Sequence, residues 1–405
     1  MTNSTHTPSS HRVHIAFFGR CNSGKSSLIN ALTGQEVAIV SEIAGTTTDS
    51  VLKPIELPGL GATILIDTPG LDDNTLLGNQ RKAQSLKAID KTDIAVVLFH
   101  DDDTSIEEAI IAQLKVREIP VVGVISKCDT MQNRASLISK VNNIIGDEPI
   151  ALSASTKVGI DQLLARLASL AHQEPRLITE GLCESGDIVV LVMPQDAQAP
   201  KGRLIKPQVE VLRELLDRGC NAFCCTPENL KSALYTLSTP PQLIITDSQV
   251  FASVNEIVEK YRQQMELSQL PLLTSFSILF ARYKGDIDTF VEGAKKLQSL
   301  TPSSRILIAE ACSHIPQNED IGRVKLPRML RNCIGENLQI DIVGGNDFPE
   351  DLSQYDLAIH CGACMFNRRH VMSRVAQAKA QNVAITNYGI AIATLTGIID
   401  KVNIK

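Results

Sequence analysis

The fold of the N-terminal part of this chain is decided by residues 13–26, which read VHIAFFGRCNSGKS. The first six of them form an apolar, β-favouring run, and the apolar spacing of residues 26–32 predicts a helix. The glycine-rich segment between strand and helix fits the G-x-x-x-x-G-K-S/T phosphate-binding loop in the context that this motif requires. Backbone N–H groups and the helix N-terminus would face the phosphates, Lys25 would neutralise them, and the Ser26 hydroxyl would bind Mg²⁺.

A second motif follows at Asp67-Thr68-Pro69-Gly70, after the apolar strand predicted for residues 63–66. A carboxylate at this place can hold Mg²⁺ through water, and the Gly70 amide can meet the terminal phosphate. These two motifs together predict a nucleoside triphosphate site. In its first loop the residues expected to contact the nucleotide are Gly19, Asn22, Ser23, Gly24, Lys25, Ser26 and Ser27.

Selection of the base is predicted from residues 126–129 (SKCD), which follow the strand predicted at residues 121–125 and resemble the guanine-reading Asn-Lys-x-Asp motif. Asp129 would accept two N–H bonds from the guanine edge, which adenine cannot supply. Ser126 replaces the usual Asn, so weaker affinity or selectivity is expected. Residues 153–155 fit the last guanine-loop element. The residues predicted to bind guanine are Lys127, Asp129, Ser153 and Ala154.

Length and composition limit the classes of protein to consider. With 405 residues the chain exceeds what one hydrophobic core usually serves, so two or three domains are expected. A formal net charge of −6 argues against a surface that binds nucleic acid. No run is long and charge-free enough to span a bilayer, and residues 1–12 lack the apolar core of a secretory signal, so we expect a cytoplasmic protein without membrane contact. Its 10 cysteines would then be core residues or metal ligands rather than disulfides.

Strands alternate with helices up to about residue 170, which predicts a GTPase domain over residues 1–171. Three more strands are predicted at residues 187–192, 221–225 and 242–246. They are apolar on both faces and indicate a small parallel sheet in a second domain, over residues 180–262, that shows no catalytic constellation. Because an apolar edge strand of such a sheet can pair with its counterpart in another subunit, we expect a homodimer.

A third domain is predicted over residues 270–405, beginning with helical patterns at residues 272–283 and 287–297. Its strands are predicted at residues 305–309, 339–343, 356–359 and 383–386. Cys312 lies just past the first of these strands, and His360-Cys361 lies just past the third. Strand ends on one side of an open parallel sheet share one crevice, so these residues are expected to meet there.

The cysteines of this domain have the spacing of a metal or redox site. Cys361 and Cys364 form a C-x-x-C pair, which can bind a metal or an iron–sulfur cluster or act as a redox pair. Cys312 supplies a third thiolate. Soft thiolates favour zinc or iron–sulfur over magnesium or calcium, and a closed structural zinc site of three cysteines and one histidine is the alternative to a cluster.

Residues 41–49 (SEIAGTTTD) resemble the first switch of the Era and TrmE-like GTPases. By that resemblance Thr47 is a Mg²⁺ ligand, and the residues that carry hydrolysis are Lys25, Thr47, Asp67 and Gly70. In that group an Asn in the phosphate loop, here Asn22, accompanies activation by K⁺, whose charge would replace that of an arginine finger.

A water-orienting Gln is absent after Gly70, where the sequence has Leu71. We therefore expect slow, potassium-stimulated hydrolysis of GTP to GDP and phosphate. Asp72 and Asp73 follow and are considered as residues that aid hydrolysis, although solvated loop carboxylates are the plainer interpretation.

The order of features along nearly the whole chain resembles HydF, the family of GTPase maturases of [FeFe]-hydrogenases. The features are a potassium-type GTPase, a small dimerising domain, and then Cys-x-His followed after a long gap by His-Cys-x-x-Cys. The resemblance implies an α/β protein of three domains: a P-loop GTPase, a dimerisation domain and a cluster-binding domain. It also implies that Cys312, Cys361 and Cys364 hold a [4Fe–4S] cluster.

The same resemblance implies what the protein does and with which partners. It would receive a diiron precursor made by the radical-SAM maturases HydE and HydG, carry it on or near the cluster, and transfer it to apo-hydrogenase. GTP hydrolysis would regulate the exchange of partners rather than perform the iron chemistry, because the two sites lie on separate domains. The cofactors implied are GTP, Mg²⁺, K⁺ and the cluster, with the diiron precursor bound transiently.

Three thiolates leave one of the four irons without a cysteine, so that iron would carry a displaceable oxygen or nitrogen ligand. The residues considered for this position are His360, His314, Glu319 and Asp320. Arg368 and Arg369 follow the C-x-x-C pair and could attract an anionic iron complex, or simply form a solvated helix start.

Two other functions fit parts of the sequence. The first is a regulatory or assembly GTPase of the Era and TrmE kind with a structural zinc module. The second is a binding scaffold whose nucleotide site barely turns over, as Leu71 and Ser126 allow.

Overall fold

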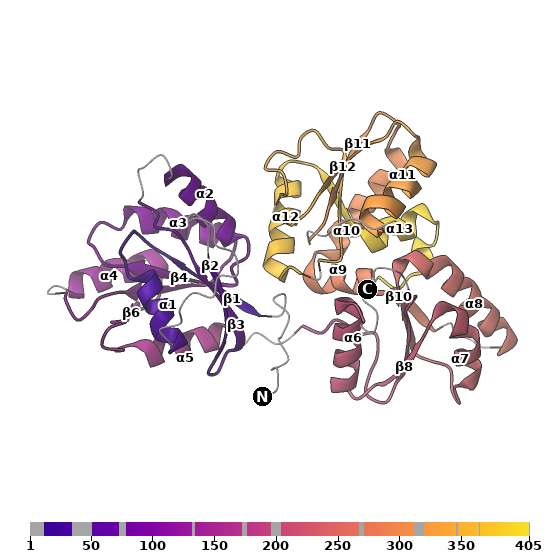
Figure 1. The fold of residues 1–405 in the computed structure, drawn as a ribbon, viewed down its shortest axis with the longest axis horizontal. Helices are drawn as coiled ribbons and strands as arrows, with labels where there is room; N and C mark the ends of the chain where they lie inside the picture. Colours follow the sequence, from indigo (N-terminus) through magenta and orange to yellow (C-terminus); the bar gives the residue numbers. More distant parts are fainter. Residues whose placement is uncertain are drawn as a thin grey trace. The chain divides into compact units, whose positions relative to one another are not determined.

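The computed structural model of the chain forms two compact units, residues 1–175 and residues 176–405 (Figure 1). The residues that the structure describes are 12–34, 51–72, 78–131, 134–171, 176–195, 204–266, 271–311, 320–345, 347–363 and 365–404. Both units are α/β, as the sequence predicts. Among the described residues no helix combines the length and the apolar character needed to cross a bilayer.

The first unit is built on a six-stranded sheet with the order β2-β3-β1-β4-β5-β6. The strands are β1 (Val13–Phe18), β2 (Val51–Leu57), β3 (Gly61–Asp67), β4 (Ile94–Phe99), β5 (Val121–Ile125) and β6 (Ile150–Ala151). All neighbouring pairs are parallel except β2 and β3, which are antiparallel. The edge strand β2 is largely exposed and was missed in the sequence, because it lacks the apolar run of the buried strands.

Helices cover both faces of this sheet. They are α1 (Lys25–Thr33), α2 (Gly78–Ile89), α3 (Ser105–Val116), α4 (Arg134–Ile145) and α5 (Ile160–Ala171). Apolar residues of α1 and α5 form one core with one face of the sheet, and apolar residues of α2, α3 and α4 form a second core with the other face. The strands between them are buried on both faces, which explains their continuous apolar runs.

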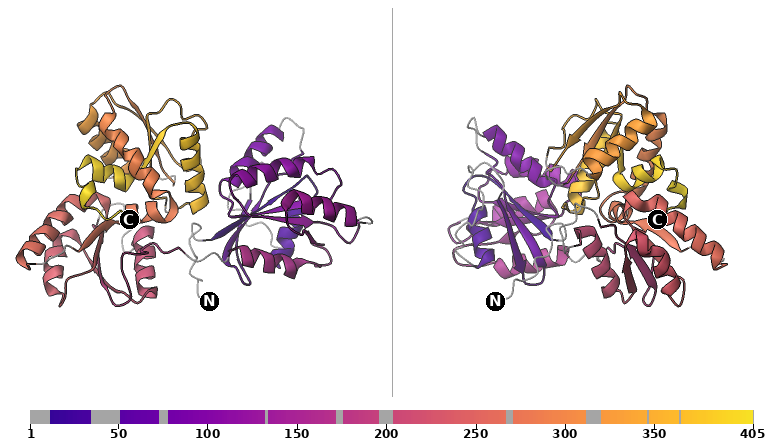
Figure 2. Two further views of the ribbon diagram at one scale, coloured as in Figure 1. Left: turned by 180° about the vertical axis from the view of Figure 1, so that it is seen from behind. Right: turned by 45° about the vertical axis from the view of Figure 1, so that its right-hand side comes forward.

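The second unit contains two parallel sheets of four strands each (Figure 2). The first has the order β10-β9-β7-β8 and the second has the order β12-β11-β13-β14. Their strands are β7 (Ile188–Val192), β8 (Asn221–Cys225), β9 (Leu243–Thr246), β10 (Leu272–Ser275), β11 (Arg305–Ala309), β12 (Gln339–Val343), β13 (Leu357–His360) and β14 (Ala384–Asn387). Their helices are α6 (Lys206–Asp217), α7 (Leu230–Thr236), α8 (Phe251–Gln264), α9 (Phe276–Lys284), α10 (Ile287–Lys295), α11 (Leu326–Ile334), α12 (Arg368–Ala380) and α13 (Tyr388–Leu395).

One prediction about this unit was wrong. Residues 272–275 were expected to begin a helix, but they form β10, which extends the predicted three-stranded sheet to four by pairing with β9. The helix begins only at Phe276, because the Ser275 side chain accepts the backbone N–H of Ile278 at 3.3 Å and caps it. The free side of β10 is covered near the chain end, where the Asn403 N–H donates to the Leu273 carbonyl at 2.7 Å.

The two sheets of the second unit share one apolar core. Val190 and Ile244 of the first sheet belong to the same buried cluster as Ile306 and Ile359 of the second. Helix α9 packs against α6 on one side and against α12 and α13 on the other. The helix that follows β10 therefore links the predicted second and third domains.

Candidate nucleotide site and cysteine centre

The phosphate loop has the conformation that its sequence requires. A Cβ atom on Gly19 would lie 2.8 Å from the Leu98 carbonyl oxygen on β4, so the loop passes β4 too closely for any side chain there. Gly24 has a φ of 94° and forms the N-cap of α1. Asn22 has a φ of 58°, which Asn tolerates better than most residues.

Lys25 lies under this loop with 7% of its surface exposed. Its Nζ donates to the carbonyl oxygens of Gly19 at 3.0 Å and Arg20 at 2.7 Å. Burial lowers the pKa of this ammonium, against the opposing influence of Asp67. The cation is thus held at the loop where phosphates would bind.

The predicted Mg²⁺ ligands of the two motifs meet. Strand β3 pairs with β1 so that Asp67 is the partner of Phe17, and the Ser26 hydroxyl donates to Asp67 Oδ2 at 2.6 Å. A hydroxyl and a carboxylate at this spacing are the hard oxygen ligands that Mg²⁺ prefers. Thr47, with the rest of the first switch, lies outside the described residues.

The segment after β3 lies directly on the phosphate loop. A Cβ atom on Gly70 would lie 2.8 Å from the Cys21 nitrogen, so only glycine fits this approach. The Cys21 N–H donates to Asp72 Oδ1 at 2.5 Å, and burial of Asp72 is outweighed by its hydrogen bonds from Cys21, so the pKa of Asp72 is lowered. The side chain of Leu71 packs against the apolar core. Asp73, the other carboxylate considered, lies outside the described residues.

The two guanine elements lie side by side. The Ser155 hydroxyl donates to Asp129 at 3.3 Å, and the hydroxyls of Ser153 and Ser155 are 2.9 Å apart. Ser126, which replaces the usual Asn, is buried and donates its hydroxyl to the Phe99 carbonyl at 3.2 Å. The Ser126 side chain is thus hydrogen-bonded to the last residue of β4.

One pair of contacts to the phosphate loop was missed in the sequence. The Arg20 guanidinium donates to Asp103 Oδ2 at 2.6 Å and approaches Glu107 Oε2 at 3.5 Å. Glu107 is 2% exposed, and burial raises the pKa of its carboxyl group. Because Glu107 is 87 positions away from Arg20, nothing in the loop motif could indicate this contact.

In the second unit, the ends of the neighbouring strands β11 and β13 lie side by side at Cys361. Register pairs Ala309 of β11 with His360 of β13, and the Cys361 N–H donates to the Ala309 carbonyl at 3.0 Å. The half-buried Cys361 Sγ accepts the N–H groups of Ala311 at 3.1 Å and Ala363 at 3.4 Å. The residue directly before Cys312 in the sequence is thus in contact with the first cysteine of the C-x-x-C pair.

Four predicted residues of this centre lie outside the described part of the chain, namely Cys312, Cys364, His314 and Glu319. Within the described part, no group of three or more His, Cys, Asp and Glu side chains is arranged to hold a metal ion. Asp320 is 2% exposed, and its Oδ1 accepts the Arg323 N–H at 2.8 Å, so it caps the turn before α11.

His360 is enclosed and has a partner on each ring nitrogen. Its Nδ1 is 2.8 Å from the Cys361 carbonyl oxygen, which can only accept, and its Nε2 is 3.0 Å from an Arg374 nitrogen, which can only donate. These partners require a neutral imidazole with its proton on Nδ1. Burial, followed by the charge of Arg374, lowers the pKa of His360 to about 3.

Arg368 is the first residue of α12, but it is half-buried rather than fully solvated. Its guanidinium donates to the Gly285 carbonyl at 2.6 Å, just past the end of α9. Burial, followed by the charges of Arg176 and Arg369, lowers the pKa of Arg368 to about 10. This side chain therefore helps to join α12 to α9.

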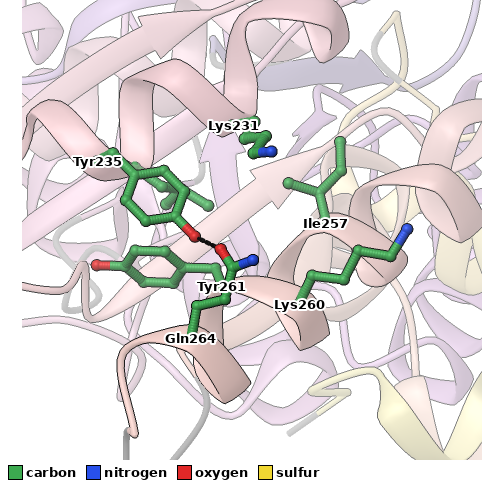
Figure 3. Close-up of a pocket in the computed structure, with 7 residues that line it drawn as sticks. Lys231, Tyr235, Ile257, Lys260, Tyr261 and Gln264 are labelled. Atoms are coloured by element: carbon green, nitrogen blue, oxygen red, sulfur yellow. Dashed lines mark hydrogen bonds between the residues drawn. The ribbon is translucent and has the colours of Figure 1, made fainter.

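Helices α7 and α8 enclose a separate cavity of about 170 Å³ (Figure 3). Its lining residues are Lys231, Leu234, Tyr235, Ile257, Lys260, Tyr261 and Gln264. The Tyr235 hydroxyl bonds the Gln264 side chain, and the rings of Tyr235 and Tyr261 meet edge to face. The lining contains no carboxylate, thiol or imidazole.

Comparisons with curated proteins match the GTPase part. The chain is 37% identical over 157 residues to the tRNA modification GTPase MnmE of Laribacter hongkongensis, covering 37% of this chain and 33% of that protein. It is 33% identical over 166 residues to MnmE of Endomicrobium trichonymphae, covering 39% and 35%. The chain thus spans about a third of the length of these relatives. A crystal structure of Era with MgGDPNP and a segment of 16S ribosomal RNA superposes with a TM-score of 0.35 at 20% identity, covering 53% of this chain and 93% of that one.

Three family models match successive parts of the chain. Residues 14–127 match the 50S ribosome-binding GTPase model, residues 178–285 match the hydrogen maturase F dimerization domain, and residues 288–404 match the hydrogen maturase F tetramerization domain. The last two models account for both sheets of the second unit, and the first accounts for the phosphate loop and for its sheet as far as β5. Because these three models occur in this order and together span most of its length, the chain belongs to HydF, the family of hydrogenase maturase GTPases.

Proposed function

We propose that this protein hydrolyses GTP during [FeFe]-hydrogenase maturation and carries a [4Fe–4S] cluster on Cys312, Cys361 and Cys364. A diiron precursor bound on or near the cluster is its cargo. The cargo comes from the radical-SAM maturases HydE and HydG and passes to apo-hydrogenase. Family membership and the geometry around Cys361 support this proposal.

The single observation that carries the cluster assignment is the environment of the Cys361 sulfur. Two backbone N–H groups, of Ala311 and Ala363, point at this atom from 3.1 and 3.4 Å. Such bonds favour the thiolate over the thiol and are typical around iron–sulfur clusters, where they tune the reduction potential. Ala311 and Ala363 also directly precede Cys312 and Cys364 in the sequence. The residues present therefore fit a cluster.

A cluster bound by three cysteines supplies one iron whose remaining ligand can be exchanged, which suits a carrier. His360 is a poor choice for that ligand, because binding iron would break either its bond to the Cys361 carbonyl or its bond from Arg374. We therefore favour His314 or Glu319 for this position over His360.

In the GTPase unit we assign each predicted site residue a role in binding or hydrolysing GTP. Lys25 neutralises the outer phosphates, Ser26 and Asp67 hold Mg²⁺, and the Gly70 amide meets the terminal phosphate. Leu71 packs against the apolar core, and its side chain has no polar atom to orient water, so hydrolysis is slow. A potassium ion held by Asn22 supplies the missing positive charge. Asp129 and Lys127 read guanine.

The protein forms an oligomer through its second unit. Strand β10 is covered by residues near the chain end, whereas β8 is the other edge of the same sheet. The strand β8 carries the half-buried Phe223 and the exposed Cys224, and its pairing with a second copy would join two sheets. We propose that two copies form a homodimer through β8. The domain over residues 288–404 would then join such dimers to one another.

The alternative is a GTPase with a structural zinc module, which the same thiolates allow. Anaerobic reconstitution with iron and sulfide separates the two functions. A brown protein with broad absorption near about 400 nm, from sulfur-to-iron charge transfer, supports the cluster. A colourless protein that binds one zinc ion and no sulfide would overturn it.

A further inference from the structure

A buried lysine supports the loop that carries the C-x-x-C pair. Lys284, the last residue of α9, has 1% of its surface exposed. Its Nζ donates to the carbonyl oxygens of Ala363 at 3.1 Å and Phe366 at 3.0 Å, and it lies 5.1 Å from the centre of the Phe280 ring. These two carbonyl groups belong to residues on either side of Cys364 in the sequence. The cation therefore contacts the backbone of the cysteine loop.

The loop needs this support because its backbone is strained. Ala363 has a φ of 54°, a left-handed conformation that residues with a Cβ rarely adopt. It is 3% exposed, and the Phe366 N–H donates to its carbonyl at 3.1 Å, which closes a tight turn. Such strain persists only where the surroundings hold it, and it is concentrated at functional sites.

The helix that presents the lysine is itself fixed. Arg368 bonds the carbonyl of Gly285, directly after Lys284, at 2.6 Å. At the other end of α9 the Ser277 hydroxyl donates to Asn387 Oδ1 at 3.1 Å, and Asn387 is the last residue of β14, the strand next to β13. The ammonium is thus placed by a rigid element rather than by a mobile side chain in solvent.

We propose that Lys284 is a positioning residue of the cysteine centre, which holds the carbonyl groups of Ala363 and Phe366 and places a buried positive charge beside the iron–sulfur cluster. This inference rests on the function proposed above. Three thiolates give the cluster a net negative charge, which grows when it takes up an electron. A cation in a site of low dielectric constant therefore stabilises the reduced state most.

Two substitutions separate the two tasks. Lys284→Met removes both the charge and the hydrogen bonds, whereas Lys284→Gln removes the charge and keeps an N–H donor. Lys296→Met, at an exposed lysine of the same unit, is the matched control. Each protein is reconstituted anaerobically, its iron and sulfide contents are measured, and the midpoint potential is obtained by a redox titration followed by electron paramagnetic resonance.

We expect Lys284→Met to retain the cluster about ten-fold less well than the wild type, as for other residues that support metal ligands. Lys284→Gln should retain it nearly as well as the wild type. Both variants should have a more negative midpoint potential, and Lys296→Met should match the wild type. Should Lys284→Met fail to fold, the potential of Lys284→Gln decides alone.

The two levels of the proposal fail in different ways. Loaded Lys284 variants with the wild-type midpoint potential would overturn the role of Lys284 and leave the cluster assignment intact. A wild-type protein that takes up no iron and sulfide would overturn the proposed function, and the role of Lys284 with it.

Discussion

The backbone N–H of Ala311 donates to the sulfur of Cys361 across 3.1 Å, so the ends of β11 and β13 meet at the cysteine motif. This contact joins segments that are 50 positions apart in the sequence. It places the residue before Cys312 at the first thiol of the C-x-x-C pair. The sequence motif and the parallel register of the sheet thus both point to the ends of β11 and β13 as the cysteine centre.

The first prediction concerns the phosphate loop. Lys25→Ala should lower the rate of GTP hydrolysis by at least about a hundred-fold, because it removes the cation that balances the outer phosphates. Ser26→Ala should shift hydrolysis to higher Mg²⁺ concentrations, because it removes a hydroxyl proposed to hold Mg²⁺ beside Asp67. Phosphate release at several Mg²⁺ concentrations measures both effects. Ser139→Ala is the matched control, because this exposed hydroxyl donates to the Ala135 carbonyl one turn earlier in α4. A Lys25→Ala variant that hydrolyses GTP at the wild-type rate would show that the phosphate loop is not the site of hydrolysis.

The second prediction concerns potassium. Asn22→Gly keeps the left-handed backbone of the loop, because glycine accepts the φ of 58° at this position, but it removes the side-chain oxygen. The ratio of the hydrolysis rate in K⁺ to that in Na⁺ should be high for the wild type and should fall towards one in the variant. Equal stimulation of both proteins would show that Asn22 does not hold the ion.

The third prediction concerns base selection. Asp129→Asn should weaken GTP binding by about a hundred-fold or more, because it replaces an acceptor of two guanine N–H groups by an amide. The same variant should gain affinity for xanthosine triphosphate, whose base offers an acceptor there. Titration calorimetry with both nucleotides tests this. Asp161→Asn, an exposed residue on α5, serves as the control. Unchanged preference for GTP would contradict the assignment of Asp129.

The fourth prediction concerns acid stability. Burial opposes ionisation of Asp286, but its hydrogen bonds from Thr289 and the ammonium of Lys379 lower its pKa to about 2. A carboxyl group with a depressed pKa stabilises the fold above its unfolded pKa and loses this contribution as pH falls through its folded pKa. The free energy of unfolding should therefore fall by about 1–2 kcal/mol between pH 4 and pH 2 through this group.

Asp286→Asn tests this, because the amide oxygen can still cap α10 while the titration is removed. Urea unfolding at a series of pH values should give a shallower loss of stability for the variant in this range. Parallel curves for the two proteins would exclude Asp286 as a source of the pH dependence.

The fifth prediction concerns oligomerisation. Cys224→Lys places a charge on the exposed side of the β8 edge and should shift the protein towards smaller species, because lysines at an edge strand oppose pairing. Val209→Lys on α6, which is also exposed, should have no effect. Light scattering after gel filtration measures the mass. A dimer that survives Cys224→Lys would place the interface away from β8.

Much of the fold could be predicted because most of its strands are short apolar runs in the sequence. β8 and β11 occur at the residues expected, since each is a short apolar run bounded by turns. β10 was mistaken for the start of a helix because Leu272 and Leu273 continue the apolar spacing of α9, and only the cap at Ser275 separates them.

Only the site residues that belong to sequence motifs could be predicted. The spacing within the phosphate loop indicated Lys25 and Ser26, and the strand ends indicated Cys361. The contact of Arg20 with Glu107 and the burial of Lys284 depend on packing between distant elements, which no local pattern encodes. The engagement of both nitrogens of His360 is a consequence of the same packing.

The most direct test is the iron and sulfide content of the protein reconstituted without oxygen, compared between the wild type and Cys361→Ser. We predict about four irons and four sulfides for each wild-type chain, with a large loss in the variant. A wild-type protein that binds neither, or a variant that keeps its full content, would contradict the account.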